Sequence, residues 1–257
     1  MSLPGKGIHM LKDVEKTVNE ITEWIREYFE KNGPKCSAVV GISGGKDSSV
    51  TAALLVRALG RERVVGVMMP DGVQPDIDDS GTLVEHLQIP NLTVNINGAT
   101  TALKEALTEA GAFVSRDTQI NIPPRVRMTT LYAVAQGLEN GGRVINTCNK
   151  SEDYIGYSTK FGDSAGDMSI LAAFTVEEVL QIGDFLGLPE SLVHKKPSDG
   201  LSGMSDEDKI GFTYKALDRY IATGICEDEE IRNKIDRMHR MNLHKLELMP
   251  HFEPSES

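Results

Sequence analysis

The residues of this chain that are best suited to chemistry lie in one short segment rich in glycine and serine. It comprises Ser43-Gly44-Gly45-Lys46-Asp47-Ser48 and stands between a short apolar run and a helical pattern. Glycines in such a turn let backbone N–H groups approach an anion, and the helix that follows adds a favourable dipole. The hydroxyls of Ser43 and Ser48 add two donors. The segment is predicted to bind phosphate groups, and the alternative is a plain glycine turn with a serine helix cap.

Asp47 is the unusual member of this segment, because a carboxylate repels phosphates unless a cation lies between them. Mg²⁺ commonly takes one or two carboxylates together with phosphate oxygens, so Asp47 is predicted to be a metal ligand. The segment is not a Walker loop. Asp47 stands where that loop has Ser or Thr, and Val40 stands where it requires glycine.

The elements that must position this segment follow from the spacing of apolar residues. A helix is predicted from Leu11 to just before Gly33, followed by a buried parallel strand over 37–42. Further strands are predicted over 64–69, 92–96 and 143–146, with helices over 48–59, 75–87, 101–110 and from Thr175 onward. Strands separated by helices predict an α/β fold with a doubly wound, mostly parallel sheet flanked by helices, which is Rossmann-like.

Two later segments carry more specific expectations. Asn121 is predicted to cap a helix that Pro123-Pro124 begin, since proline fits the first helical turn. Residues 149–167, which are rich in Gly, Ser and Asp, are predicted to form a long functional loop. No linker divides the chain, so one domain is expected over residues 1–257, with 1–10 outside the fold and 246–257 as a tail.

The composition excludes several classes of protein. The 38 acidic and 27 basic residues give a net charge of −11, which disfavours a broad nucleic-acid interface. No apolar run is long enough to span a membrane, and the start lacks a signal pattern. The three cysteines fit neither a disulfide framework nor a zinc site. We expect a cytoplasmic protein that binds neither nucleic acid nor membrane.

Ligands in open parallel sheets bind outside the carboxyl ends of the strands. Three polar segments fall at such ends, namely 43–48, 70–74 and 147–152. Thr147 directly follows a predicted strand, so its hydroxyl could reach a nucleotide whose phosphates are bound by residues 43–48. Glu152 could give a second carboxylate to the same Mg²⁺, or it could be a solvated loop acid.

Two arginines and one loop suggest where a second anionic ligand binds. Arg125 and Arg127 fall in the first turn of the helix predicted at the prolines, where a cation is unfavourable unless an anion is bound. At least one of them is expected to contact a phosphate or carboxylate of the substrate, although a surface salt bridge stays open for Arg127. Residues 157–167 mix acids, one lysine and glycines, as in loops that close over charged ligands.

With these segments in order, the chain resembles the ammonia-dependent NAD synthetases of the ATP pyrophosphatase (adenine nucleotide alpha-hydrolase-like) superfamily. The matching segments span nearly the whole chain and are Gly41–Ser48, Pro124–Met128, Thr159–Asp163 with Asp167, and Leu243–Lys245. The resemblance implies a ligase that amidates deamido-NAD with ammonia, using ATP and releasing AMP and pyrophosphate through an acyl-adenylate. It also implies a homodimer with the dinucleotide at the subunit interface.

The resemblance further implies roles for individual residues. ATP, the co-substrate, would be bound by Gly41, Ile42, Ser43, Gly44, Gly45, Lys46, Asp47, Ser48, Thr147 and Ser198. The cofactor Mg²⁺ would be held by Asp47 and Glu152. Deamido-NAD would be bound by Arg125, Lys160, Asp167, His244 and Lys245. Apart from the resemblance, ammonium must lose a proton before it can react, and Asp163 is the candidate catalytic residue that helps to remove it.

Some positions depart from the pattern of the family. Val176 replaces a lysine, and Lys195 or Lys196 is a candidate to take over its role. Cys148 is expected to be a buried spectator. Two alternatives remain open, a tRNA-modifying ATP pyrophosphatase and a nucleotide-binding module without catalysis. The acidic composition argues against the first, while Val176 favours the second.

Overall fold

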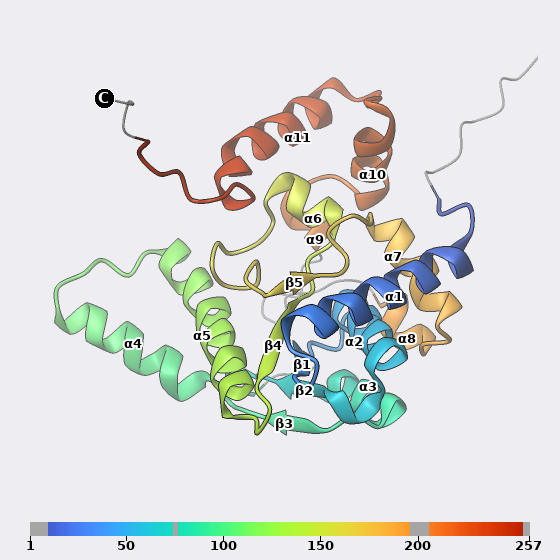
Figure 1. Ribbon diagram of the computed structural model, residues 1–257. Coiled ribbons are helices and arrows are strands. Elements are labelled where there is room, and N and C mark those ends of the chain that lie inside the picture. The colour runs from blue at the N-terminus through green and yellow to red at the C-terminus, as the bar shows by residue number, and fades with distance from the viewer. Residues whose placement is uncertain (1–9, 74–76, 196–205, 254–257) are drawn as a thin grey trace, which may run out of the picture.

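The computed structural model describes residues 10–73, 77–195 and 206–253. Its centre is one parallel sheet of five strands in the order β3-β2-β1-β4-β5 (Figure 1). The strands are β1 (Ser37–Gly41), β2 (Val64–Met68), β3 (Asn91–Thr93), β4 (Gly142–Asn146) and β5 (Met168–Ser169). The chain adds β2 and β3 on one side of β1, then returns to add β4 and β5 on the other. The predicted doubly wound sheet is confirmed.

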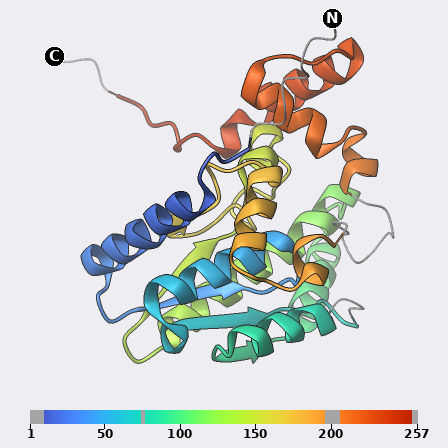
Figure 2. The ribbon, with the colours of Figure 1, turned by 90° about the vertical axis from the view of Figure 1, so that its right-hand side faces the viewer.

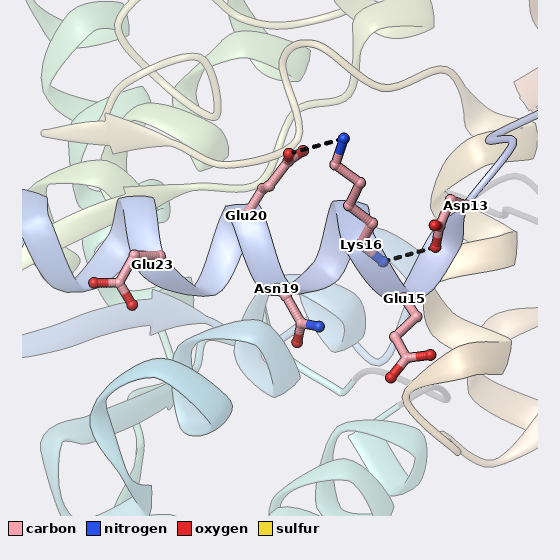
Figure 3. A pocket seen from close by; sticks show the side chains of 6 residues that line it. All are labelled: Asp13, Glu15, Lys16, Asn19, Glu20 and Glu23. Carbon is pink, nitrogen blue, oxygen red and sulfur yellow. Dashed lines mark hydrogen bonds and ion pairs between the residues drawn. The ribbon is translucent and has the colours of Figure 1, made fainter.

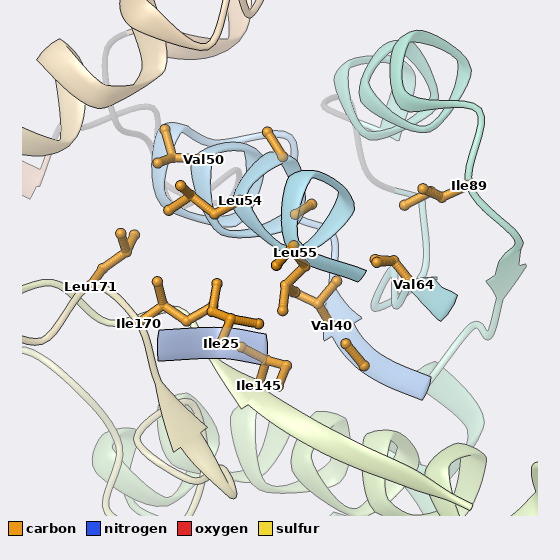
Figure 4. Packing of buried hydrophobic residues seen from close by; sticks show 14 of the residues in the cluster. Ile25, Val40, Val50, Leu54, Leu55, Val64, Ile89, Ile145, Ile170 and Leu171 are labelled. Atoms are coloured by element: carbon orange, nitrogen blue, oxygen red, sulfur yellow. The ribbon is translucent and has the colours of Figure 1, made fainter. Parts of the chain in front are cut away.

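Among the described residues, five helices cover one face of this sheet. They are α1 (Val14–Asn32), α2 (Lys46–Leu59), α3 (Ile77–Leu87), α7 (Val176–Phe185) and α8 (Glu190–Val193). From β1, Ala38 and Val40 point into this layer, where Ile25 of α1 and Leu54 of α2 are fully buried (Figure 4). The apolar side chains of β1 on this face are thus part of the main hydrophobic core.

The opposite face is covered by α4 (Asn97–Glu109) and α5 (Arg116–Gly137). Val39 of β1 points to this side, as the alternation of side chains along a strand requires, and packs in one cluster with Val144 and Ala135. Only Thr100 of α4 is buried, and of α5 only Ile122 and Ala135 are buried. The outer surface of these two helices is therefore largely exposed, while the sheet face beneath them is buried.

A third group of helices lies beyond the carboxyl ends of the strands (Figures 1 and 2). Within the described residues it comprises α6 (Lys150–Ile155), α9 (Asp206–Ile210), α10 (Tyr214–Thr223) and α11 (Glu229–Asn242). Ile155, Val176, Leu217 and Ile235 form its buried centre. Two 3₁₀ turns, η1 (Arg61–Arg63) and η2 (Leu243–Lys245), complete the elements. No helix of the described residues has the length and apolar character that crossing a membrane requires.

The prediction for the start of α5 is wrong. The helix begins at Arg116, where Ser115 Oγ accepts a hydrogen bond from Thr118 N at 3.1 Å, so both prolines lie inside it. Asn121 does not cap the helix, because its side-chain amide donates to Asp117 O at 2.8 Å, within the helix. The first turn of the helix is thus capped by Ser115, and each proline leaves one carbonyl of the preceding turn without its backbone donor. Arg125 and Arg127 are therefore not in the first turn, and the dipole argument for them does not hold.

Other boundaries shift for local reasons. α2 begins at Lys46. β3 ends at Thr93, although Val94 N and Ile96 N still donate to Met68 O and Pro70 O at 2.9 Å each before α4 begins. The prediction of a loop over 149–167 is wrong at its start, since Asn149 accepts from the N–H groups of Ser151 and Glu152 and begins α6. Residues 156–167 form neither helix nor strand, as predicted.

Candidate active site

The glycine loop leaves the sheet at the carboxyl end of β1, where the strand order changes direction. Ile42 still follows the sheet, with its N–H donating to Val67 O at 2.9 Å. Gly44 has a φ of +77°, and a Cβ added there would lie 2.7 Å from Asp79 Cβ. Only glycine satisfies both the positive φ and this close approach. The glycine predicted from the motif is therefore required by the packing of α3.

Hydrogen bonds inside the loop fix its shape. Ser43 Oγ and Ser48 Oγ lie 3.0 Å apart, and Ser43 Oγ also accepts from Gly45 N at 3.2 Å. Ser48 Oγ donates to Gly45 O at 3.1 Å. The two hydroxyls predicted as phosphate donors thus hold the turn in place, and of the two only Ser48 is buried.

A buried lysine lies between the two predicted metal ligands. Lys46 Nζ is 2.7 Å from Asp47 Oδ2 and 3.8 Å from Glu152 Oε1. Burial lowers the pKa of Lys46, but the two carboxylates outweigh it and raise this pKa overall. Burial and the Asp47 charge raise the pKa of Glu152 above its usual value, while Lys46 opposes them. The structure therefore brings Asp47 and Glu152 together around one cation, and Glu152 is not a solvated loop acid.

Asn149 joins the two strand ends and was missed from the sequence. Its Nδ2 donates to Asp47 Oδ1 at 2.9 Å, and its Oδ1 accepts from Ser151 N and Glu152 N at 3.0 Å each. The signal was present, because an asparagine shortly after a strand and just before an acidic helical turn is a typical helix cap. Asn149 orients Asp47 and sets the start of α6.

Tyr214, at the start of α10, packs against the group formed by Lys46, Asp47 and Glu152. The Lys46 ammonium lies 5.7 Å from the centre of its ring, in cation–π contact. Burial, with Glu152 nearby, raises the pKa of Tyr214, so its hydroxyl keeps its proton. No local pattern in the sequence indicates that this tyrosine reaches the glycine loop.

A second group forms where the C-terminal turn η2 meets the 156–167 loop. Lys160 Nζ donates to His244 O at 2.6 Å, and Arg125 Nε donates to Lys160 O at 3.3 Å. Lys245 Nζ donates to Gly156 O at 2.6 Å and to Ser158 O at 2.8 Å. Four of the five residues expected to bind the dinucleotide are thus brought together from three distant parts of the sequence.

The fifth, Asp167, lies apart from that group in the described contacts. Its Oδ2 accepts from Val144 N of β4 at 2.7 Å, and Tyr132 OH of α5 donates to Oδ1 at 3.4 Å. Tyr28 OH donates to the Asp167 carbonyl at 2.9 Å. Asp167 therefore ties α1, β4 and α5 together.

Asp163 is held inside the loop, facing the second group. Its Oδ1 accepts from Thr159 N at 2.8 Å. Burial raises the pKa of Asp163, while the Thr159 hydrogen bond and the charge of Lys245 oppose that shift. Cys148 Sγ is 3.4 Å from Asp163 O, and burial raises the pKa of the thiol, which fits the expected spectator role.

The remaining predicted positions fall as follows. Thr147 directly follows β4, whereas Ser198 and Lys196 lie outside the described residues. Val176 is buried among apolar side chains of the third cluster. Lys195 pairs with Asp79, whose Cβ approaches Gly44, so Lys195 stands beside the glycine loop.

One surface hollow is unrelated to this site. Figure 3 shows it along the polar face of α1, lined by Asp13, Glu15, Lys16, Asn19, Glu20 and Glu23. Its contacts are those of an ordinary helix surface, with the Asp13 cap on Lys16 N at 2.9 Å and a Lys16–Glu20 pair at 3.7 Å. From another element, Arg57 of α2 donates to Asn19 Oδ1 at 3.0 Å, which is an ordinary contact between neighbouring helices.

Comparison with known proteins agrees with this geometry. The family model described as NAD synthase matches residues 17–251. The NH(3)-dependent NAD(+) synthetase of Pyrococcus furiosus is 35% identical, over 91% of this chain and 93% of that protein. That of Methanosarcina acetivorans is 37% identical, over 93% and 98%. The structure of an NMN synthetase from Francisella tularensis is 31% identical with a TM-score of 0.84, over 93% and 99%. This chain belongs to the NAD synthase family.

Proposed function

We propose that this protein is a ligase that amidates the nicotinate carboxylate of deamido-NAD with ammonia, using ATP. The observation that carries the proposal is the group at the switch point of the sheet. There a phosphate-type loop, a buried lysine and two carboxylates from different strand ends converge. A module that only binds nucleotide has no need for a second carboxylate at this place.

The chemistry explains why ATP is required. A carboxylate does not react with ammonia in water, because oxide would have to leave. In the first step a carboxylate oxygen attacks the α-phosphorus of ATP, and the bond to the bridging oxygen breaks to release pyrophosphate. In the second step the ammonia nitrogen attacks the acyl carbon. The bond to the AMP oxygen breaks, the nitrogen loses a proton, and the amide and AMP are formed.

The donor set of the site fits Mg²⁺. Asp47 and Glu152 provide hard carboxylate oxygens that already share one cation, the Lys46 ammonium. No group of three or more His, Cys, Asp or Glu that could hold a metal occurs in the described part of the chain. Two carboxylates with substrate phosphates are the arrangement that Mg²⁺ prefers. When bound, the ion neutralises charge on the phosphates.

The other roles follow the placement of the residues. The loop from Gly41 to Ser48 is proposed to bind the triphosphate, with Thr147 near the nucleotide. Ser198 lies outside the described residues, and its hydroxyl is proposed as an ATP contact on the resemblance alone. Lys160, Arg125, His244 and Lys245 are proposed to bind the dinucleotide, with Asp167 positioning the strand beneath. Asp163 is proposed to accept a proton from ammonium, because burial raises the pKa of its carboxyl.

We further propose a homodimer formed through α4 and α5. These helices bury few of their own residues, and Leu103, Phe113 and Ile120 are exposed on or between them. A partner subunit would cover these side chains on the outer surface of the two helices. Sedimentation velocity on the purified chain distinguishes a dimer of about twice 28.1 kDa from a monomer.

A second substrate has one specific observation in its favour. The solved relative from Francisella tularensis is an NMN synthetase by its description. Nicotinate mononucleotide presents the same carboxylate without the adenylate half of deamido-NAD. It is therefore the second candidate for this chain.

The test is one assay with two substrates. The protein is incubated with Mg-ATP, ammonium chloride and either deamido-NAD or nicotinate mononucleotide, and the products are separated by chromatography. We expect NAD and AMP in equal amounts from deamido-NAD. The specificity constants rank the two substrates, since a preference for the mononucleotide would assign the second candidate. ADP as the product, or no amide from either substrate, would contradict both.

A further inference from the structure

Arg127 lies on α5 at the carboxyl edge of the sheet, with most of its guanidinium unpaired. The side chain is half-buried, and its Nε donates to Met69 O, directly after β2, at 3.1 Å. Within residues 10–73, 77–195 and 206–253 this is its only hydrogen bond, and no carboxylate oxygen lies within 4.0 Å. A guanidinium has about five N–H donors, so the others have no protein acceptor.

The charges around Arg127 do not compensate for its burial. Burial lowers the pKa of Arg127, while Asp71 and Asp163 oppose this shift from a distance. Both carboxylates are engaged elsewhere. Asp71 Oδ1 accepts from Thr100 Oγ1 at 2.9 Å, and Asp163 Oδ1 accepts from Thr159 N at 2.8 Å. A half-buried cation without an ion-pair partner costs free energy, which an arriving anion would recover.

On one side, this part of α5 adjoins the start of the glycine loop. Leu131 lies one turn after Arg127, and a Cβ added at Gly41 would be 3.7 Å from Leu131 Cδ1. The same added Cβ would lie 3.2 Å from the Met69 side chain, whose backbone carbonyl binds Arg127. The residues that flank Arg127 thus contact the proposed ATP-binding segment.

On the other side, α5 contacts the 156–167 loop. A Cβ added at Gly162 would lie 2.9 Å from Pro124 Cβ, and Thr159 Oγ1 donates to Asn121 Oδ1 at 2.8 Å. Arg127 therefore stands between the segment proposed for ATP and the segment proposed for the dinucleotide. The α-phosphate and the carboxylate, which repel each other, must meet in this region for the first step.

We propose that Arg127 binds an oxyanion at the point where the two substrates meet, either the reacting carboxylate or the α-phosphate of ATP. The proposal rests on the proposed function, which supplies both anions. Donors aimed at such an oxyanion reduce the repulsion as the carboxylate oxygen approaches phosphorus. The removal of one such group from an active site typically costs a factor of about 10²–10³ in rate.

The first experiment compares the Arg127→Gln and Arg127→Lys variants with the wild type. Wild-type formation of NAD and AMP tests the proposed function independently of the variants. We expect Arg127→Gln to lower kcat/KM by about 10²-fold or more. The kcat/KM of Arg127→Lys should lie between those of the wild type and Arg127→Gln, because lysine keeps the charge but not the planar guanidinium. The control is Arg61→Gln, an exposed arginine in η1 at the opposite edge of the sheet, which should change kcat/KM by less than about twofold.

A stability measurement separates this role from a structural one. Arg127→Gln removes an incompletely paired charge, so its thermal midpoint should equal or exceed that of the wild type. If Arg127 served only to hold Met69 O, the midpoint would fall, and activity at a temperature where the variant is fully folded would be normal. That result would overturn the proposal.

Binding measurements then distinguish the two anions. Dissociation constants are measured calorimetrically for deamido-NAD, NAD and α,β-methylene-ATP, whose α–β bridge does not break. If the carboxylate is the ligand, Arg127→Gln weakens deamido-NAD by about tenfold or more and leaves NAD, which carries the neutral amide, unchanged. If the α-phosphate is the ligand, only the ATP analogue is weakened. Unchanged constants for all three, with kcat/KM within about threefold of the wild type, would refute the role of Arg127.

Discussion

The two halves of the candidate site are built in different ways. The half at the ends of β1 and β4 starts from contacts between close neighbours, where the Ser43 and Ser48 hydroxyls fix the loop and Lys46 pairs with Asp47. Asn149 and Glu152 join this loop from the segment that follows β4. The half at the 156–167 loop depends on lysine side chains that donate to distant backbone carbonyls, as Lys245 does to Gly156 and Ser158. The residues of the first half follow a buried strand, whereas those of the second half lie in or against a segment that is neither helix nor strand.

This difference separates two physical tasks. A triphosphate with its metal needs donors and carboxylates held in fixed places before it arrives, because preorganised charges cost no rearrangement during the reaction. A dinucleotide must enter and its product must leave, so its contacts belong to a loop that can open. Changes in the first half should therefore affect the rate of the chemical steps, while changes in the second should affect binding.

The largest effect is expected from Asp47→Asn. The variant removes one of two carboxylates proposed for Mg²⁺, so kcat should fall by about 10³-fold, which corresponds to about 4 kcal/mol. The fold should survive, because the asparagine oxygen can still accept from Asn149 Nδ2 and Glu152 still faces Lys46. Electron paramagnetic resonance with Mn²⁺ and ATP measures metal binding directly, and it should show a weakened site.

The matched control is Asp184→Asn, an exposed carboxylate on α7 that pairs with His194. It should keep its activity and its Mn²⁺ binding. If Asp47→Asn bound Mn²⁺ as well as the wild type does, Asp47 would be only the ion-pair partner of Lys46. The contrast between the two halves of the site would then lose its main support.

Much of the first half could be predicted from sequence, because its information is local. Glycine spacing and the apolar run of β1 indicate a phosphate-type loop, and parallel topology brings Glu152 to the same edge as Asp47. Asn149 was overlooked, although its position before α6 is a normal cap signal. Tyr214 could not be found, because its contact with Lys46 is made by a helix far along the chain, with no pattern linking the two.

The second half was predicted only through family resemblance. No periodicity indicates that Lys245 reaches the carbonyls of the 156–167 loop, since these contacts depend on how α11 packs. The start of α5 was misplaced because the Pro123-Pro124 pair is a stronger helix-start signal in the sequence than Ser115, although the helix begins at the Ser115 cap. That error also assigned Arg127 an incorrect reason for binding an anion. The roles of the individual site residues stay predictions.

A smaller effect on stability tests how rigidly the first half is built. Gly44→Ala should lower the free energy of unfolding by about 3 kcal/mol, since it adds the strain of a positive φ to overpacking against Asp79. Gly224→Ala is the matched control. Its backbone is left-handed with a φ of +70°, but nothing lies within 4 Å of the added Cβ, so only about 1 kcal/mol of strain is expected. If chemical denaturation showed the same loss of unfolding free energy for both variants, α3 would have moved to make room for the added methyl group. This half of the site would then not be rigid.

The smallest effect is expected in the second half, from Lys245→Met. The variant leaves the carbonyls of Gly156 and Ser158 without their lysine donor and loosens η2 from the loop. The KM for deamido-NAD should rise by about tenfold, while kcat stays within about threefold, because Lys46, Asp47 and Glu152 are untouched. Lys215→Met, an exposed lysine of α10, is the control for loss of charge and should leave both constants unchanged. A fall in kcat at constant KM would place Lys245 in the chemical steps. A residue that holds the 156–167 loop would then act on the reacting groups themselves, and the division between a fixed half and a closing half would be wrong.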